Sequence, residues 1–225
     1  MAAIRGYSAA QLRAAEAPHL AAGEPLMRMA AAALADEIRR LLDVQPSRVL
    51  LLIGSGNNGG DALYAGAELA AEGIEVWILP TGPRMHEEAL AAATGAGARI
   101  AQKTDTLRLA READVIVDGI LGTGTSADPA LRGEAREIVA AILPVLAEQI
   151  VVAVDIPSGI GPDDGSVPDP IVLPADVTVT FGGYKAGLLL PPAAALAGRV
   201  RLVDIGLEAD LAGLEPLVTV AEPAD

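Results

Sequence analysis

Six polar residues follow apolar runs of the chain, at points where a strand would end. They are Asn57, Asn58, Asp61, Asp118, Asp155 and Ser158. The runs before them end at Ile53, Val117 and Val154. In an open α/β sheet, ligands bind outside the carboxyl ends of the strands. Backbone N–H groups and polar side chains gathered there could bind a nucleotide-like ligand. We therefore expect these residues to share one site.

A glycine-rich turn, Gly54 to Asp61, precedes an alanine-rich segment that is typical of a helix. The spacing of Gly54, Gly56 and Gly59 satisfies the G-x-G-x-x-G pattern, in which the main chain approaches a pyrophosphate at a helix N-terminus. The alternative is that the glycines make only a tight turn and that the polar residues beside them cap the helix.

Two features disfavour an ordinary NAD site, and with it an NAD-dependent dehydrogenase. The second strand, Glu75 to Leu79, runs into Pro80-Thr81-Gly82 without the acidic residue that would hold a ribose. Asp61 also places a negative charge beside the expected anion site. We therefore expect the turn to bind a further group of its ligand in addition to a pyrophosphate.

Lys185 lies among glycines just past a predicted strand that ends at Phe181. It could pair with a ligand phosphate or with an active-site aspartate. The alternative is an ordinary exposed lysine. For Asp118 and Asp155, the alternative to a site is simple structural capping.

Strands and helices are predicted to alternate after Pro46, which indicates a parallel sheet covered on both faces. The predicted strands are Arg48 to Ile53, Glu75 to Leu79, Arg99 to Ala101, Asp114 to Val117 and Ile150 to Val154. The predicted helices between them are Asn58 to Ala71, His86 to Ala93, Thr104 to Glu112 and Leu131 to Leu146. Two helical segments precede this region, and the second has an apolar face.

The last third is predicted to extend the sheet at one edge. Its strands are Ile171 to Phe181, Arg199 to Val203 and Leu217 to Val220, with a short helix at Ala193 to Ala197. We expect a single domain over residues 1–225, because a chain of this length can form one sizeable core.

The composition excludes several functions. A formal charge of -14 disfavours nucleic acid as a partner. The absence of cysteine and the presence of only two histidines exclude thiolate chemistry and a histidine metal cluster. No apolar run reaches the ~20 residues of a membrane span, and the start lacks a secretory signal, so we expect a cytoplasmic protein with no membrane contact.

Four segments carry a resemblance to a known family. They are Gly54 to Asp61 (GSGNNGGD), Val117 to Gly124 (VDGILGTG), Val152 to Gly159 (VAVDIPSG) and Val177 to Pro192 (VTVTFGGYKAGLLLPP). From Leu26 to Leu207 the chain resembles the NAD(P)H-hydrate epimerase family, the YjeF N-terminal domain. The resemblance implies a Rossmann-like three-layer α/β/α sandwich with a mostly parallel central sheet, often as a homodimer.

The resemblance also implies an isomerase that interconverts the R and S forms of hydrated NADH and NADPH, with one bound potassium ion. The ion ligands it implies are Asn58, Asp118 and Ser158. The substrate-binding residues implied or expected are Asn57, Asn58, Gly59, Gly60, Asp61, Gly122, Thr123, Gly124, Thr125, Ser126, Ala127, Asp128, Asp155 and Lys185. The hydrate dehydratase that is often fused to this family would have to be a separate protein here.

The chain departs from the family pattern at two places. Ala62 stands where a glycine is usual, and the tripeptide that ends at Lys185 is Gly-Tyr-Lys where Ala-Pro-Lys is more common. Asp155 is the candidate catalytic residue that transfers the proton, while Asp118 is better suited to positioning. The rival interpretation is a non-catalytic nucleotide-binding or scaffolding module of the same fold.

Overall fold

The computed structural model describes residues 3–42, 47–124 and 128–221. Its centre is a seven-stranded, all-parallel sheet in the order β4-β3-β2-β5-β6-β7-β9. The strands are β2 (Arg48–Ile53), β3 (Glu75–Pro80), β4 (Arg99–Ile100), β5 (Val115–Gly119), β6 (Ile150–Val154), β7 (Val177–Phe181) and β9 (Arg199–Val203). The parallel sheet predicted from the sequence is confirmed.

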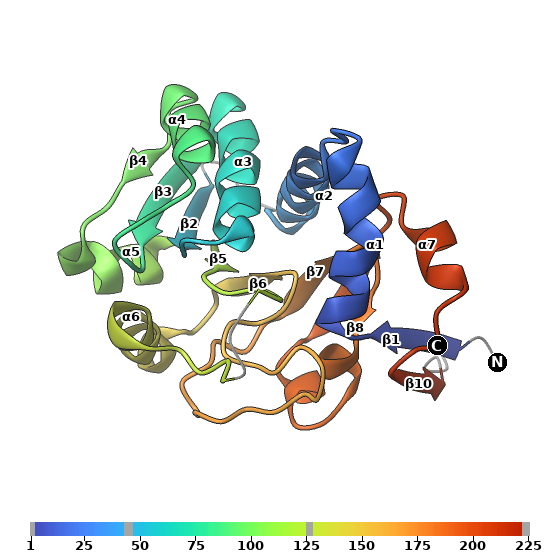
Figure 1. Cartoon of the computed structure of the whole chain (residues 1–225). Coiled ribbons are helices and arrows are strands. Elements are labelled where there is room, and N and C mark those ends of the chain that lie inside the picture. Colours follow the sequence, from blue (N-terminus) through green and yellow to red (C-terminus); the bar gives the residue numbers. More distant parts are fainter. Residues whose placement is uncertain (1–2, 43–46, 125–127, 222–225) are drawn as a thin grey trace.

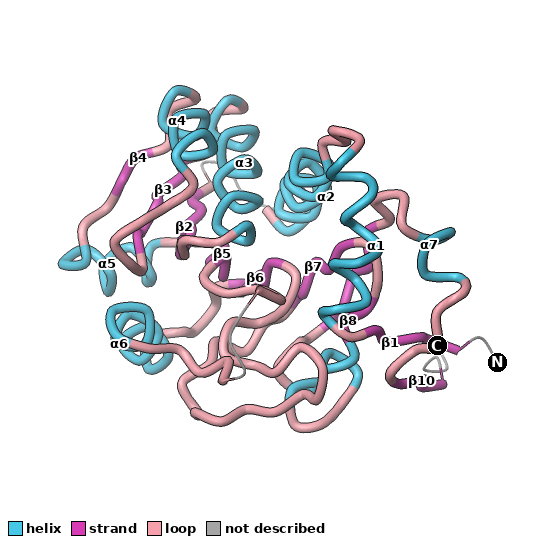
Figure 2. Tube along the Cα trace, viewed as in Figure 1, coloured by secondary structure: helices cyan, strands magenta, loops and turns pink. Residues whose placement is uncertain are grey.

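Helices cover both faces of this sheet (Figures 1 and 2). On one face lie α1 (Ala9–Ala21), α2 (Leu26–Leu41), α3 (Asn57–Ala71) and α4 (Glu87–Gly95), and on the other α5 (Thr106–Glu112) and α6 (Gly133–Ile142). Side chains alternate across a strand, so Leu51 packs under the first group and Leu52 under the second. The molecule is therefore the three-layer α/β/α sandwich that the sequence predicts.

A second, three-stranded sheet joins distant parts of the chain (Figure 1). It consists of β1 (Ala3–Tyr7), β8 (Tyr184–Lys185) and β10 (Val218–Ala221). β1 runs antiparallel to β10 and parallel to β8, and Ala3 is the register partner of Ala221. The prediction that the last strand extends the main sheet is wrong, since β10 pairs with β1 instead. β1 and β8 are not predicted from the sequence.

Other short elements lie around the two sheets. They are α7 (Glu208–Ala212) and the 3₁₀ turns Lys103–Asp105, Leu143–Val145, Ala186–Leu189 and Ala193–Ala195. The predicted long strand from Ile171 is wrong in its first half, because β7 begins only at Val177. Val172 and Leu173 are buried in a loop that includes Pro174, whose nitrogen has no hydrogen to donate to a sheet.

In the described part of the chain, no helix has the length and apolar character needed to cross a membrane.

The order of the strands reverses between β2 and β5. From β2 the chain continues to β3 and β4 on one side, whereas β5 is followed by β6, β7 and β9 on the other. In open α/β sheets the crevice at such a switch point, outside the carboxyl ends of the strands, is where ligands bind. Leu52 is the register partner of Asp118, so the ends of β2 and β5 are level with each other.

Candidate functional site

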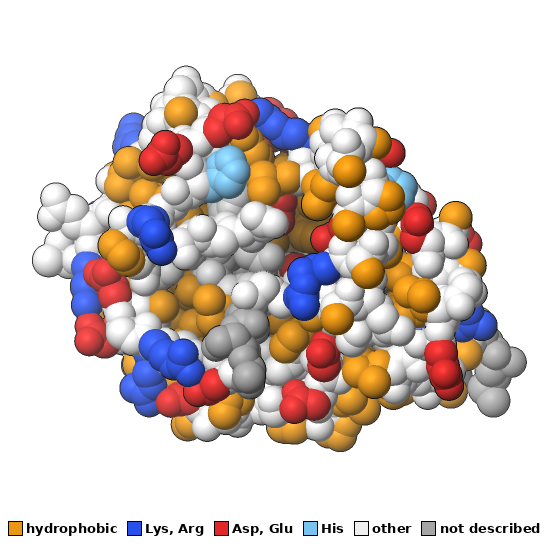
Figure 3. All heavy atoms as spheres, viewed as in Figure 1, with side chains coloured by type: hydrophobic (Ala, Val, Ile, Leu, Met, Phe, Trp, Pro, Cys, Tyr) orange, Lys and Arg blue, Asp and Glu red, His pale blue; other side chains and the backbone are white. Residues whose placement is uncertain are grey.

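A cleft opens at this switch point, between the start of α3 and the helix α1. Its wider end has a volume of about 530 Å³ and is lined by Arg13, Glu16, Asn57, Asn58 and the Gly122 to Gly124 loop, among others. A smaller cavity of about 130 Å³ adjoins it and contains Asp61 and Asp155. The two cavities share Glu16, Asn57, Asn58 and Thr123, so they are two ends of one cleft. Figure 3 shows this face hollowed between α3 and α1, with acidic side chains inside the hollow.

The glycine-rich turn is shaped by close contact between two loops. A Cβ atom on Gly54 would lie 1.8 Å from the Ile120 carbonyl oxygen, and one on Gly59 would lie 2.3 Å from the Gly54 oxygen. Gly60 is likewise buried, facing the Met27 side chain. These three glycines therefore fix the shape of the turn, which brings the start of α3 against the end of β5.

The start of α3 is open to a ligand. Its N-cap is Gly56, which makes no side-chain capping bond, so the capping role weighed for the polar residues of the turn is not what the structure shows. Asn57 and Asn58 are the first residues of the helix, whose uncapped N–H groups and dipole favour an anion. Ala62 lies inside α3, where alanine is more favourable than glycine, so this departure from the family pattern is consistent with the helix.

Asn58, Asp118 and Ser158 form a buried polar cluster at the carboxyl ends of β5 and β6. Ser158 Oγ donates to Asp118 Oδ1 at 2.6 Å, and the Ser158 N–H donates to Oδ2 at 2.8 Å. Asn58 Nδ2 donates to the main-chain oxygens of Leu121 and Val154, at 2.9 and 2.6 Å. Burial raises the pKa of Asp118, and the hydrogen bonds from Ser158 and Ile120 act in the opposite direction.

Asp155 stands at the end of β6 in a left-handed backbone conformation, with φ of 67°. Such a conformation is uncommon for a residue other than glycine, although aspartate adopts it more readily than most. Asp155 Oδ1 accepts from the Lys185 ammonium, from Thr180 Oγ1 at 3.3 Å and from the Phe181 N–H at 3.4 Å. The turn after β6 thus directs this carboxylate into the smaller cavity.

Lys185 is buried beneath Asp155, with 3% of its surface exposed. Its Nζ donates to Asp155, to Thr180 Oγ1 at 3.0 Å and to the Phe181 carbonyl at 2.9 Å. An ammonium group has three hydrogens to donate, and all three have partners here. Lys185 is therefore neither an exposed lysine nor free to bind a phosphate, and the structure pairs it with the aspartate.

Asp61 projects from α3 into the smaller cavity and is 7% exposed. Burial raises its pKa well above the usual value, and the nearby charges of Asp155 and Glu16 raise it further, whereas Lys185 lowers it. Glu16, on α1, also has a raised pKa, first because of burial. Three carboxyl groups from three different elements therefore meet in one small cavity.

Two charged residues of the cleft are not predicted from the sequence. Glu16 and Arg13 are one turn apart on α1, and Arg13 Nη1 donates to the Thr123 carbonyl at 3.0 Å. Their spacing indicates a shared helix face, but no pattern in the sequence shows that this face covers the cleft.

Only part of the loop after β5 lies among the described residues, so only some of its predicted substrate-binding residues can be located. Gly122, Thr123 and Gly124 line the wider cavity as predicted, and residues 125–127 (Thr125, Ser126 and Ala127) lie outside the described residues. Asp128 does not line either cavity. Its carboxylate accepts from the Ala130 N–H at 3.1 Å and from Arg132 Nη2 at 2.5 Å.

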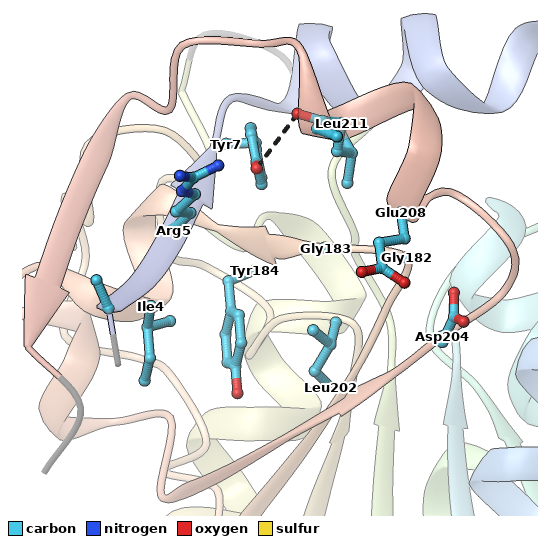
Figure 4. A pocket seen from close by; sticks show the side chains of 12 residues that line it. Ile4, Arg5, Tyr7, Gly182, Gly183, Tyr184, Leu202, Asp204, Glu208 and Leu211 are labelled. Atoms are coloured by element: carbon cyan, nitrogen blue, oxygen red, sulfur yellow. Dashed lines mark hydrogen bonds between the residues drawn. The ribbon is translucent and has the colours of Figure 1, made fainter. Parts of the chain in front are cut away.

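A separate cavity of about 550 Å³ lies between β1, β8, β9 and α7 (Figure 4). Its lining includes Arg5, Tyr184, Leu202 and Glu208, and none of the residues that the sequence places in a site. The predicted site residues line the cleft at the switch point instead, among them Asn57, Asn58, Asp61 and Asp155.

The sheet order and the position of the cleft define a Rossmann-like α/β protein with its candidate site at the switch point. A family model described as YjeF-related protein N-terminus matches residues 23–187, and the chain belongs to this family. The family predicted from the sequence motifs is confirmed.

Named relatives span nearly the whole chain. It is 58% identical over 224 residues to the "NAD(P)H-hydrate epimerase" of Clavibacter michiganensis subsp. michiganensis, with 96% of each chain covered. It is 49% identical to the protein of the same name from Microbacterium testaceum, covering 97% of this chain and 85% of that one. It is also 42% identical to the "Bifunctional NAD(P)H-hydrate repair enzyme Nnr" of Mycobacterium tuberculosis, of which it covers 44%.

Among solved structures, the yeast protein YNL200c has the same fold. The TM-score is 0.77 with 95% of each chain covered, at 19% sequence identity. This likeness supports the three-layer architecture independently of the sequence motifs.

Proposed function

We propose that this protein is an NAD(P)H-hydrate epimerase, an isomerase that interconverts the R and S forms of hydrated NADH and NADPH. The full-length relatives with that name support the activity. The structural observation that carries it is one cleft with an uncapped helix N-terminus at one end and the Asp155–Lys185 pair at the other. Such a cleft suits a dinucleotide whose pyrophosphate and reacting ring are well separated.

In this proposal, the pyrophosphate binds at the start of α3, where Asn57, Asn58 and the Gly122 to Gly124 loop line the wider cavity. Arg13 reaches this cavity from α1 and adds a positive charge. The helix dipole and the free N–H groups favour an anion at this point. The hydrated nicotinamide ring would then occupy the smaller cavity, beside Asp155 and Asp61.

The chemistry follows from the structure of the hydrate. Carbon C6 of the ring carries a hydroxyl next to the ring nitrogen. Protonation of that hydroxyl lets the nitrogen lone pair expel water, and the resulting iminium can regain water on either face. Asp155 is the catalytic carboxylate. It faces the developing positive charge and transfers a proton to or from the reacting oxygen. Lys185 acts on the substrate through Asp155, because it holds one oxygen of that carboxylate.

We infer that the Asn58, Asp118 and Ser158 cluster holds one potassium ion. The donor set supports this, since it offers a carboxylate, a hydroxyl and an amide oxygen, which suit a hard cation. The described residues contain no group of three or more His, Cys, Asp and Glu side chains that would suit a transition metal instead. Bound there, the cation would neutralise the buried charge of Asp118 and fix the loops around the cleft.

The proposed activity is tested with purified R and S epimers of the two hydrates, followed by chromatography. The protein is expected to bring either pure epimer to the equilibrium mixture, and Asp155→Asn is expected to lower the rate by about 100-fold or more while keeping the fold. A non-catalytic module of the same fold would bind the hydrates without changing their ratio. Full activity of Asp155→Asn would remove Asp155 from the mechanism.

The ion is tested by exchanging potassium for tetramethylammonium at constant ionic strength. We expect a lower epimerisation rate and a lower melting temperature, because a cation bound only to the folded state stabilises it. If neither quantity responds, the proposed ion site is wrong.

Other expectations stay predictions. The homodimer implied by the family is tested by light scattering during gel filtration. A separate hydrate dehydratase would complete the repair, as the name of the bifunctional relatives suggests. The single domain over residues 1–225 and the cytoplasmic location also rest on the sequence.

A further inference from the structure

Inverting the configuration at C6 requires two proton transfers. One group must protonate the hydroxyl that leaves, and another must take a proton from the water that adds on the opposite face. Asp155 can supply only one of these groups. A second acid–base group in the same cavity would complete the reaction.

Asp61 has the position and the environment for this role. It lines the smaller cavity together with Asp155, and it is more than nine-tenths buried. Over residues 3–42, 47–124 and 128–221, no donor forms a hydrogen bond or an ion pair with its carboxyl group. A buried carboxyl without a partner is unfavourable when charged, so burial favours the neutral, proton-carrying form of this group.

The charged groups around Asp61 come from three separate parts of the chain. Glu16 faces it from α1, Asp155 from the end of β6 and Lys185 from β8, while the cavity residues of α2, such as Met27, are uncharged. The two acids raise the pKa of Asp61 and Lys185 lowers it, with burial as the largest cause of the rise. Lys185 donates directly to Asp155 and not to Asp61. The two cavity aspartates therefore have different electrostatic environments. Enzymes use such a difference to make one carboxyl group an acid and the other a base.

We propose that Asp61 and Asp155 are a catalytic acid–base pair that acts on opposite faces of the hydrated ring. This inference rests on the proposed epimerase function and extends it. Asp61 gives its proton to the C6 hydroxyl, the C6–O bond breaks and the nitrogen lone pair forms the C=N bond. Water then adds to C6 on the other face, the C=N electrons return to nitrogen, and Asp155 takes the proton that the water loses. The reverse reaction exchanges the two roles. Inverting glycoside hydrolases divide their work between two carboxyl groups in the same manner.

The test compares Asp61→Asn with the wild type and with Asp36→Asn. Asp36 lies on α2, is largely exposed and is paired with Arg39, so its replacement makes the same chemical change away from the cleft. For Asp61→Asn we expect kcat to fall by about 100-fold or more, while KM stays within about threefold. Asp36→Asn is expected to keep the wild-type rate. Melting temperatures of all three proteins show whether each is folded.

The pH dependence separates an acid from a residue that only binds substrate. In the wild type, kcat is expected to fall as the pH rises and Asp61 loses its proton, and this alkaline decrease is expected to be absent from the residual activity of Asp61→Asn. In water labelled with ¹⁸O, the wild type is expected to place the label at C6 in each inverted product, as loss and re-addition of water require.

Three results would overturn the proposal. They are a kcat for Asp61→Asn close to that of the wild type, a variant that changes KM alone, and an unchanged alkaline decrease in the variant. A wild-type protein that does not epimerise the hydrates at all would instead contradict the proposed function. Should Asp61→Asn fail to fold, the pH profile of the wild type still tests the acid, because a kcat that does not fall as the pH rises contradicts it.

Discussion

At the scale of single residues, the two aspartates of the smaller cavity differ in their hydrogen-bond partners. Asp155 receives the ammonium of Lys185, whereas Asp61 receives no donor within the described parts of the chain. The sequence predicts that both aspartates line the site, because both follow strands. It could not predict their different environments, since Lys185 and Glu16 come from β8 and α1, whose places depend on packing between distant segments.

The burial of Asp61 predicts how stability changes with pH. Its pKa is raised in the folded state, while in the unfolded chain it is about 3.9. The stability that comes with the protonated form is therefore fully present below about pH 4 and is lost as the pH rises through the raised pKa. Because asparagine does not titrate, we expect Asp61→Asn to gain stability relative to the wild type as the pH rises.

The measurement is urea unfolding of both proteins at several values between about pH 4.5 and pH 8. Groups that titrate alike in the two proteins cancel in the difference. A difference in unfolding free energy that does not vary with pH would show that Asp61 binds protons equally in the folded and unfolded states, so that its pKa is not raised by folding.

At the scale of elements, loops from different strands touch without room for side chains. A Cβ atom on Gly122 would lie 2.2 Å from Asn58 Oδ1, which belongs to the start of α3. The loop after β5 is therefore in direct contact with the proposed ion ligand. The glycine-rich pattern predicts a tight turn, but only the structure shows that the second glycine loop presses against the first.

Gly122→Ala is expected to displace the Asn58 side chain and to weaken the response to potassium. The rate of epimerisation in potassium should approach the rate in tetramethylammonium, while the fold is kept. Gly82→Ala is the matched control, because a Cβ atom there meets no atom within 4 Å. A normal potassium response in Gly122→Ala would show that Asn58 can move without effect on the ion.

The strands and helices that follow one another in βα order are predicted well from the sequence. β2, β6 and β9 have the predicted bounds, because apolar runs bounded by turn residues define buried parallel strands. The errors lie where pairing is between distant segments. β1 and β10 are short, they are separated by almost the whole chain, and neither has a pattern that identifies its partner.

At the scale of the whole molecule, the protein and its proposed substrate carry charge of the same sign. The chain has a formal charge of -14, and hydrated NADPH carries one more phosphate than hydrated NADH. Long-range repulsion slows the approach of an anionic ligand, and salt screens it over about 10 Å at 0.1 M. In the proposed site, Arg13 and the start of α3 would attract the pyrophosphate only at short range.

We therefore expect kcat/KM to rise when tetramethylammonium chloride is added at constant potassium, and to rise more for hydrated NADPH than for hydrated NADH. Initial rates at low substrate concentration measure this. A decrease for both substrates would mean that local attraction at the cleft dominates the approach of the substrate.

The pairing of β1 with β10 has a topological consequence. Ala3 and Ala221 are register partners, so hydrogen bonds between the first and last strands already close the folded chain into a ring. β1 is also paired with β8, so it is the central strand of this small sheet and β10 is an edge strand that is hydrogen-bonded to β1. A short covalent linker between the two ends would change the folded molecule little and would act mainly on the unfolded chain, whose freedom it would reduce.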